Sequence, residues 1–200
     1  MNNKFQFVKE INEYTKKISL NNVIGNELLE NIGKELASFL NVLILSIKPK
    51  NILELGTGCG YATSVIAQAS KDYQNKVTTV EVNKKRLDKT INSLSNYGYK
   101  GINFVCEDMI TFLKQNDEFY DFIILDANPF LYIEAFLEIK NHQKNKDILL
   151  IHDSLIPQMP LAPSELKITM NEFNNFLTNQ KEYSIHQIRL GDGFWFCVKN

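Results

Sequence analysis

The sequence has little cysteine and no excess of charge of either sign. Its 22 Lys and Arg residues nearly balance its 23 Asp and Glu residues, which leaves a net charge of −1. No overall field therefore favours nucleic acid or an anionic membrane as a partner. The three cysteines, Cys59, Cys106 and Cys197, form no CxxC pair, which excludes the usual zinc and redox motifs. We expect reduced thiols and a cytoplasmic protein.

Long apolar runs are also missing. No stretch approaches the roughly 20 apolar residues that cross a bilayer, so we expect no membrane span. Residues 1–10 are polar and lack the apolar centre of a secretory signal. A chain of 200 residues can form one domain with a sizeable core. Because no linker or internal repeat interrupts it, we predict a single domain over residues 1–200.

The chain does contain an alternation of helical and strand patterns. Apolar residues at helical spacing predict two helices within residues 1–48, over about 4–18 and 29–43. We expect these N-terminal helices to form part of the cover over a substrate. Short apolar runs predict strands at 52–55, 77–82, 102–106, 122–125 and 148–151. Helical patterns separate these runs, which predicts right-handed crossovers and a parallel sheet covered on both faces.

The helix after residues 122–125 has a clear start. Asn128 can cap it, and Pro129 suits the first helical position. Phe130, Ile133 and Leu137 form an apolar stripe along it. We expect this helix to pack on the sheet.

The C-terminal part of the chain has a different pattern. Prolines punctuate the loop 155–163, and a helix is predicted over 166–177. Two further strands, at 183–188 and 194–198, are joined by only five residues. So short a connection cannot cross over a sheet, and these strands should form an antiparallel hairpin. The sequence thus predicts an α/β fold whose mostly parallel sheet ends in an antiparallel pair.

A glycine-rich loop follows the first predicted strand. It reads Glu54-Leu55-Gly56-Thr57-Gly58-Cys59-Gly60-Tyr61, and Gly56 and Gly58 let the backbone turn tightly and approach a ligand. A dinucleotide fingerprint would have a third glycine where Tyr61 stands, which argues against NAD. The Glu54 carboxylate needs a partner at an apolar strand end. A cofactor ammonium group would be a suitable one.

Acidic residues also end the next two predicted strands. Glu81 stands where acids hydrogen-bond ribose hydroxyls. Glu107 and Asp108 follow the third strand, where a carboxylate can bind an adenine amino group. Acids after three successive strands, with the glycine loop at the first, indicate a nucleoside-containing cofactor.

These blocks resemble those of the small O-methyltransferases related to catechol and caffeoyl-CoA O-methyltransferases, which belong to class I of the S-adenosylmethionine-dependent methyltransferases. The resemblance covers about residues 20–200, and the matching segments are 52–63, 77–81, 107–108, 122–127, 151–153 and 191–193. It implies a Rossmann-like sheet of seven strands in the order 3-2-1-4-5-7-6, with strand 7 antiparallel, and a homodimer. The residues that it implies for binding S-adenosylmethionine are Glu54, Gly56, Thr57, Gly58, Gly60, Tyr61, Glu81, Val82, Asp108 and Asp126.

The resemblance also assigns parts of the cofactor to these residues. Glu54 and the glycine loop would lie near the methionine portion. Glu81 would bind the ribose hydroxyls, Val82 would pack against adenine, and Asp108 would lie near the adenine amine.

The family's metal site is matched only in part. In the family, an acid after strand 4 and an Asp-Asn pair after strand 5 bind a divalent ion that activates the acceptor hydroxyl. Asp126 and Asp153 match, but Ser154 stands in the Asn position, and a hydroxyl is a poorer donor to Mg²⁺ than an amide carbonyl. Pro129 replaces a lysine suited to deprotonating the acceptor. The resemblance thus implies a divalent metal held by Asp126, Asp153 and Ser154, whereas His152 is an alternative general base.

The predicted function is O-methylation of a small-molecule hydroxyl, with Asp126, His152 and Asp153 as catalytic candidates. Two alternatives are an RNA-modifying methyltransferase, which the balanced charge disfavours, and a cofactor-binding protein that has lost catalysis. The acceptor pocket should be partly apolar. Residues expected to line it are Tyr132, Leu155, Ile156, Met159, Leu161 and Trp195.

Overall fold

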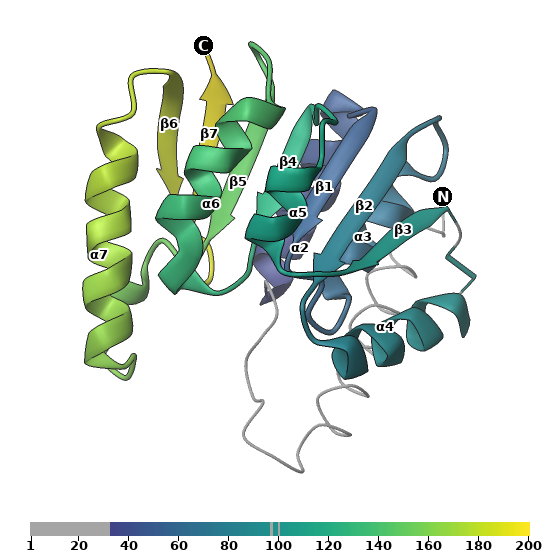
Figure 1. Ribbon diagram of the computed structural model, residues 1–200, viewed down its shortest axis with the longest axis horizontal. Coiled ribbons are helices and arrows are strands. Elements are labelled where there is room, and N and C mark those ends of the chain that lie inside the picture. Colours follow the sequence, from purple (N-terminus) through teal and green to yellow (C-terminus); the bar gives the residue numbers. More distant parts are fainter. Residues whose placement is uncertain (1–32, 97, 100) are drawn as a thin grey trace.

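The structure is a computed structural model that describes residues 33–96, 98–99 and 101–200. Its centre is a seven-stranded sheet in the order β3-β2-β1-β4-β5-β7-β6 (Figure 1). The strands are β1 (Asn51–Leu55), β2 (Lys76–Glu81), β3 (Ile102–Cys106), β4 (Phe122–Leu125), β5 (Ile148–His152), β6 (Tyr183–Ile188) and β7 (Phe194–Lys199). All neighbours pair in parallel except β7, which is antiparallel to β5 and to β6. The predicted strand order and the antiparallel hairpin are confirmed.

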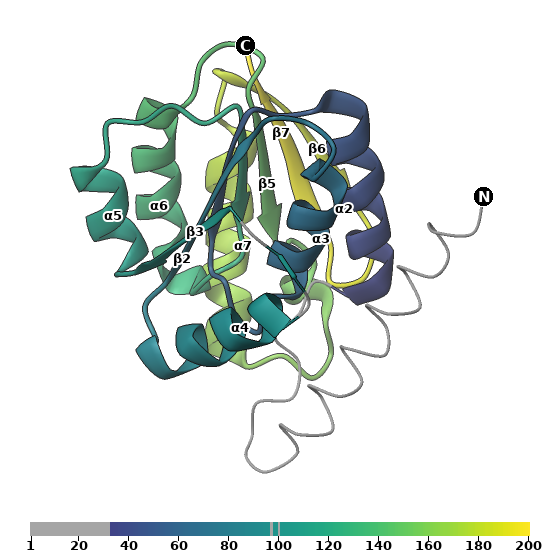
Figure 2. The ribbon, with the colours of Figure 1, turned by 90° about the vertical axis from the view of Figure 1, so that its right-hand side faces the viewer.

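Helices cover both faces of this sheet (Figure 2). They are α2 (Gly33–Ile47), α3 (Tyr61–Ser70), α4 (Lys84–Asn96), α5 (Met109–Gln115), α6 (Tyr132–Ile139) and α7 (Ser164–Thr178). Helices α2 and α3 lie on one face, and α5, α6 and α7 lie on the other. The helix predicted over 4–18 and the first residues of the one predicted from 29 lie outside the described residues. None of the helices in the described ranges has the length and apolar content needed to cross a membrane.

The strands are apolar on both sides because each face contacts a helical layer. Ile52 joins the core beneath α2 and α3, whereas its neighbour Leu53 joins the core beneath α5, α6 and α7. Alternate residues of a strand point to opposite faces, so this division follows from strand geometry. The whole of β4, Phe122–Leu125, is buried, as its unbroken apolar run predicted.

Helix α6 differs from its prediction in its start and in its buried face. The Asn128 side chain caps the start by accepting a hydrogen bond from the Phe130 backbone nitrogen (3.2 Å). Pro129 opens a 3₁₀ turn, and the α-helix begins only at Tyr132. The predicted stripe of Phe130, Ile133 and Leu137 is exposed, by 52%, 39% and 48%. The buried face consists instead of Tyr132, Ala135, Phe136 and Ile139. Both faces of this helix are apolar, so spacing alone could not select the inner one.

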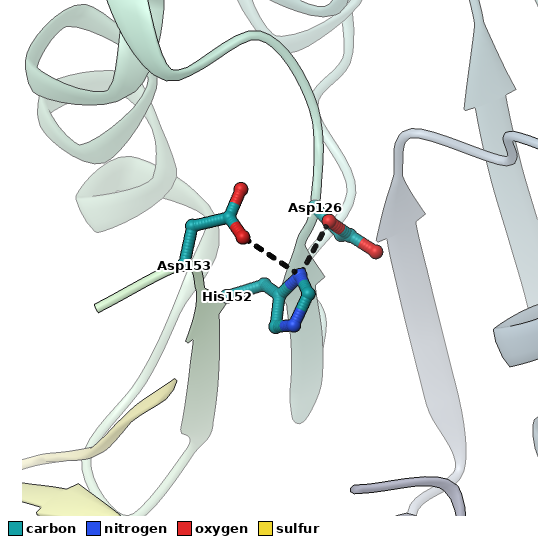
Figure 3. Close-up of side chains that lie close together, drawn as sticks. All are labelled: Asp126, His152 and Asp153. Carbon is teal, nitrogen blue, oxygen red and sulfur yellow. Dashed lines mark hydrogen bonds and ion pairs between the residues drawn. The ribbon is translucent and has the colours of Figure 1, made fainter. Parts of the chain in front are cut away.

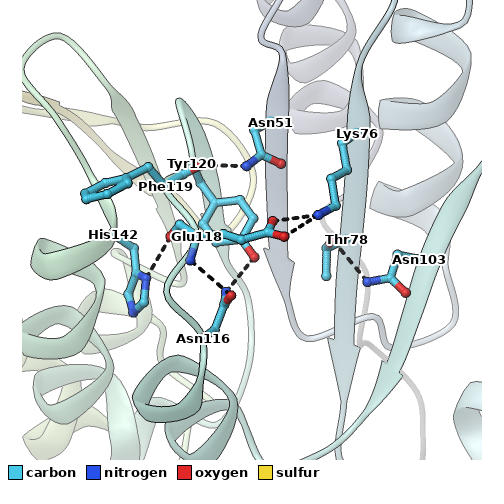
Figure 4. Close-up of polar contacts among 9 residues, drawn as sticks. All are labelled: Asn51, Lys76, Thr78, Asn103, Asn116, Glu118, Phe119, Tyr120 and His142. Carbon is cyan, nitrogen blue, oxygen red and sulfur yellow. Dashed lines mark hydrogen bonds and ion pairs between the residues drawn. The ribbon is translucent and has the colours of Figure 1, made fainter.

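Hydrogen bonds and ion pairs close the amino end of the strands (Figure 4). The Asn51 side chain, at the start of β1, donates to the Phe119 carbonyl oxygen at 2.5 Å. Lys76, at the start of β2, forms an ion pair with Glu118. These contacts join the first residues of two strands to the segment that enters β4.

His142 belongs to the same end of the sheet. It is 6% exposed, and its two ring nitrogens lie 2.9 Å from the Glu118 carbonyl oxygen and 2.8 Å from that of Leu113. The ring therefore links the end of α6 to the connection between α5 and β4.

Candidate active site

A glycine loop connects β1 to α3 at the carboxyl edge of the sheet. Gly56 has a φ of 102°, and a Cβ atom there would lie 1.9 Å from the Asp126 carbonyl oxygen. Only glycine fits, because both the backbone angle and the space exclude a side chain. The Thr57 carbonyl oxygen accepts a hydrogen bond from the Gly60 backbone nitrogen (2.9 Å), and Gly60 leads into α3. The loop thus holds the end of β1 tightly against the end of β4.

Glu54 lies beneath this loop and is 0% exposed. Its Oε2 atom accepts hydrogen bonds from the hydroxyls of Thr63 (2.6 Å) and Thr79 (2.5 Å). Burial raises the pKa of Glu54 to about 8, against a smaller lowering by the two hydroxyls. Its Oε1 atom is buried and has no hydrogen-bond partner among the described residues. The sequence did not predict these threonine partners, and Glu54 is not among the residues that line the adjacent cavity.

Glu81 ends β2 and is only 6% exposed. Its Oε2 atom accepts from the Gly58 backbone nitrogen (3.1 Å), and its Oε1 atom accepts from that of Asn83 (2.9 Å). The Arg86 guanidinium lies 3.9 Å from Oε2. The next residue, Val82, is 69% exposed although it is apolar. An oriented carboxylate therefore lies beside an uncovered apolar side chain.

Asp108 begins α5. Its Oδ1 atom accepts hydrogen bonds from the backbone nitrogens of Ile110 and Thr111, both at 3.0 Å. This is an N-cap, which accounts for an acid here without any ligand. Asp108 also lines the cavity, so the cap fixes the direction of a carboxyl group at the cavity wall.

Asp126, His152 and Asp153 converge at the ends of β4 and β5 (Figure 3). The His152 Nδ1 atom lies 3.0 Å from Asp126 Oδ1 and 3.4 Å from Asp153 Oδ1. The three side chains offer donor atoms within 4.8 Å of one another. Asp153 has a φ of 70°, in the left-handed region that few residues other than glycine adopt. The sequence predicted all three residues but not their mutual contact.

Neighbouring charges set the protonation of this cluster. Burial lowers the pKa of His152, but the Asp126 and Asp153 carboxylates outweigh it and raise the pKa to about 9. Burial also raises the pKa of Asp153, to about 6, although the imidazole opposes this shift. An imidazole that already carries both protons at neutral pH donates hydrogen bonds. This state does not suit the alternative role of general base.

Ser154 is not brought to this cluster. It is 0% exposed, and its hydroxyl has no hydrogen-bond partner among the described residues. A Cβ atom at Gly193 would lie 2.6 Å from the Ser154 Oγ atom, so the hydroxyl is buried against that glycine. Ser154 is also absent from the described cavity wall. The donors at this place are therefore two carboxylates and an imidazole, and the predicted third oxygen does not join them.

One cavity of about 670 Å³ connects the glycine loop to this cluster. Its acidic lining residues are Glu81, Glu107, Asp108, Asp126, Asp153 and Asp192, and its basic ones are Arg86 and His152. Its apolar wall includes Leu131, Ile156, Met159, Ala162 and Leu166. A cavity with this lining suits a ligand that carries positive charge.

Several predicted lining residues lie elsewhere. Tyr132 packs edge-on against Phe173, with ring centroids 5.3 Å apart, and the Trp195 indole donates to Asn174 Oδ1 at 2.7 Å. Leu161 is 98% exposed. Tyr132, Leu155, Leu161 and Trp195 do not line the cavity, whereas Ile156 and Met159 do.

Two charged lining residues, Arg86 and Asp192, were not predicted as site residues. Arg86 stands in the basic run of residues 84–86. Nothing in the sequence distinguished it from the lysines beside it, which were expected to face solvent. Asp192 stands between two glycines, in a segment that matched the family without an assigned role. The only available signal was its place in that matching segment.

The comparisons with known proteins agree with this geometry. A family model described as O-methyltransferase matches residues 2–200. The chain belongs to this O-methyltransferase family. Caffeoyl-CoA O-methyltransferase 5 of Nicotiana tabacum is 24% identical over 206 residues, which cover 95% of this chain and 82% of that protein. The resemblance inferred from the sequence is confirmed.

Another relative of the chain is an uncharacterized RNA methyltransferase of Mycoplasma mobile. It is 27% identical over 193 residues, which cover 96% of this chain and 47% of that protein. The chain thus spans about half the length of this relative.

Solved structures share the fold of this chain. The S-adenosylhomocysteine-bound methyltransferase PaMTH1 of Podospora anserina has a TM-score of 0.84 at 17% identity, over 96% of this chain and 87% of that one. The O-methyltransferase of Bacillus cereus in complex with S-adenosylhomocysteine has a TM-score of 0.80 at 17% identity, over 100% and 93% of the two chains. The Rossmann-like class I methyltransferase fold predicted from the sequence is therefore confirmed.

Proposed function

We propose that this protein transfers the methyl group of S-adenosylmethionine to a hydroxyl oxygen of a small molecule. The observation that carries the proposal is one cavity that joins the glycine loop and the strand-end acids to the Asp126–His152–Asp153 cluster. A methyl donor and its acceptor must lie in one such space for a direct transfer. The family, and the S-adenosylhomocysteine bound to the structural relatives, support the cofactor.

The cofactor lies, on this proposal, at the end of the cavity nearer β1, β2 and β3. Glu81 accepts hydrogen bonds from the ribose hydroxyls, Val82 packs against adenine, and Asp108 accepts from the adenine amine. The methionine portion lies along the glycine loop and the first residue of α3, with Asp126 at its far end. These loop and helix residues are Gly56, Thr57, Gly58, Gly60 and Tyr61. The acidic lining favours a cofactor that carries a sulfonium and an ammonium group. Contact of the cofactor with Glu54 stays a prediction, because that carboxyl lies behind the wall.

The acceptor lies between the cofactor and the cluster. A carbon–oxygen bond forms to the methyl group while the carbon–sulfur bond breaks, and the sulfonium becomes a neutral thioether. The acceptor's hydroxyl proton passes to one of the two carboxylates, Asp126 or Asp153, and His152 orients them. Because the sulfonium is an activated leaving group, the protein mainly aligns the reactants and removes a proton. Ile156, Met159 and Leu166 offer an apolar surface to the rest of the acceptor.

Four further predictions from the sequence remain proposals. These are a single domain over residues 1–200, a cover formed by residues 1–48, a homodimer and a cytoplasmic location. RNA as the acceptor is the second candidate, because one relative is named an RNA methyltransferase. The predominantly acidic cavity lining is a poor match for a phosphate backbone.

The first test is a calorimetric titration of the full chain with S-adenosylmethionine, after removal of any bound ligand. We expect saturable binding that Glu81→Gln weakens about tenfold or more, equivalent to about 1.4 kcal/mol. Glu118→Gln is the matched control, because it makes the same chemical change at the opposite end of the sheet. Absence of binding to the folded protein, or equal weakening by both variants, would contradict the proposal.

The second test identifies the acceptor class. Tritiated S-adenosylmethionine is incubated with catechols, caffeoyl-CoA and unmodified tRNA in parallel. Transfer to a small hydroxyl compound is expected. Transfer to tRNA alone would establish the RNA candidate, and binding without any transfer across a broad panel would favour a protein that has lost catalysis.

A further inference from the structure

The space between the Asp126 and Asp153 carboxylates is where the family resemblance implies a divalent ion. In this protein an imidazole nitrogen lies there. The His152 Nδ1 atom is 3.0 Å from Asp126 Oδ1 and 3.4 Å from Asp153 Oδ1, and both interactions meet at this one atom (Figure 3). Divalent ions bind carboxylate oxygens directly, at about 2.0–2.6 Å. An ion would therefore compete with the imidazole for the same two oxygens.

The third donor of the implied metal site is missing from this space. The Ser154 backbone is held by its neighbours, because its carbonyl oxygen accepts from the side chains of Asn174 (2.9 Å) and Gln187 (3.2 Å). Its hydroxyl is fully buried against Gly193 and is not on the cavity wall. The residues present therefore do not fit the oxygen-rich site that Mg²⁺ requires.

Two facing carboxylates still need a positive group between them. Of the described residues that line the cavity, only Arg86 and His152 are basic. Arg86 lies at the other end, 3.9 Å from the Glu81 carboxylate. His152 is thus the basic side chain that lies between Asp126 and Asp153, and it is only 8% exposed. Burial strengthens such a charge-assisted contact.

The same three side chains offer an alternative, in which the imidazole is itself a metal ligand. Their donor atoms are close enough together to hold an ion, and imidazole suits Zn²⁺ and similar metals. In that arrangement Nδ1 would have to give up the proton that it donates to Asp126. The 3.0 Å contact between Nδ1 and Asp126 Oδ1 is a hydrogen-bond distance, but two ligands of one ion can lie equally far apart. The metal titration described below separates the bridge from coordination.

We propose that His152 takes the place of the divalent ion, so that its Nδ1–H group bridges Asp126 and Asp153 and the site works without a metal. Only activity of the site without a metal rests on the proposed function. Occupation of the space by the imidazole can be tested without an acceptor. His152 acts here as a positioning residue, which holds the two carboxylates apart and oriented toward the acceptor.

The experiment measures metal binding by the full chain. Mn²⁺, Mg²⁺ and Zn²⁺ are each titrated calorimetrically into the wild-type protein, His152→Ala, and His152→Ala combined with Asp126→Asn. We expect no saturable binding by wild type at submillimolar ion. His152→Ala should gain Mn²⁺ binding at least tenfold tighter, because its two carboxylates are released. The double variant should lose that gain, which would locate the ion at this site.

Two results would overturn the proposal. Tight binding by wild type that His152→Ala abolishes would make the imidazole a ligand. No gain in His152→Ala, with S-adenosylmethionine binding intact as proof of folding, would mean that the imidazole does not exclude the ion. Once an acceptor is known, methyl transfer by wild type should be unchanged by EDTA. Failure of the proposed function would appear separately, as absent cofactor binding or absent transfer.

Discussion

The two ends of the sheet use acidic side chains differently. At the amino end two acids have partners of their own: Glu118 forms an ion pair with Lys76, and Asp121 accepts two backbone N–H groups. At the carboxyl end, six acids line one cavity with only two basic side chains among the described residues that line it. Acids that are satisfied within the protein hold the fold together. Acids gathered around one cavity repel one another even where each has a hydrogen-bond donor, which favours a cationic ligand there.

The largest expected effect comes from the point where the glycine loop touches β4. In Gly56→Ala the new Cβ atom would lie 1.9 Å from the Asp126 carbonyl oxygen. We expect the free energy of unfolding to fall by several kcal/mol, from both overlap and an unfavourable φ. Urea unfolding measures this loss, and calorimetry should show cofactor binding lost as well.

Gly98→Ala is the control for that substitution. Gly98 also has a positive φ, of 80°, but a Cβ atom there would meet nothing within 4 Å. Only backbone strain remains, at about 1–2 kcal/mol. Equal losses in the two variants would show that contact with Asp126 is not what requires glycine in the loop.

The next effect concerns the buried carboxyl of Glu54, whose pKa is raised from 4.5 to about 8. The folded state favours the neutral form of this carboxyl. Glu54 therefore contributes its whole stabilisation below its ordinary pKa, and this stabilisation is lost as the pH rises through about 8. Glu54→Gln stays neutral throughout. The free energy of unfolding of this variant, relative to that of wild type, should therefore rise by a few kcal/mol from about pH 5 to about pH 9. Urea unfolding at both pH values checks this, and a difference independent of pH would show that Glu54 is ionised in the folded protein.

A smaller effect is expected at the amino end. Asp121 accepts from the backbone nitrogens of Lys50 (2.7 Å) and Asn51 (2.8 Å). Asp121→Ala should lower the free energy of unfolding by roughly 2 kcal/mol, because both donors lose a charged acceptor. The affinity for S-adenosylmethionine should be unchanged. A clear loss of affinity on calorimetric titration would mean that the two ends of the sheet are coupled.

The smallest effect separates the two roles of Asp108. Asp108→Ala removes the cap of α5 and should cost about 1 kcal/mol, whereas Asp108→Ser keeps a capping oxygen and should cost less than half of that. Both variants remove the carboxylate, so both should weaken S-adenosylmethionine binding equally if that group accepts from the adenine amine. Recovery of affinity in the serine variant would leave Asp108 with only the capping role.

The carboxyl edge also shows how far the sequence could predict this protein. The strands and the glycine loop follow from local patterns: an apolar run such as Phe122–Leu125 is buried on both faces, and Gly56 stands where the chain must turn. The inner face of α6 could not be chosen, because Phe130 and Phe136 lie on opposite apolar faces of one short segment.

The sequence also could not predict side-chain partners that come from distant segments of the chain. The Glu54 Oε2 atom accepts hydrogen bonds from Thr63 and Thr79, which come from the following helix and the neighbouring strand. The position of the His152 ring between two carboxylates depends on rotamers and on the backbone angle at Asp153. None of these has a local sequence signal, although all the residues concerned are visible in the sequence.

The left-handed backbone of Asp153 has a consequence for protein engineering. Glycine adopts a φ of 70° most readily, and asparagine and aspartate come next. Asparagine is therefore the substitution that removes the charge at 153 without disturbing the chain. A laboratory evolution campaign that rewards heat tolerance alone should drift toward glycine there, since glycine relieves the strained angle. Such a campaign would give a more stable protein that lacks the Asp153 carboxylate. Activity therefore has to be part of the screen.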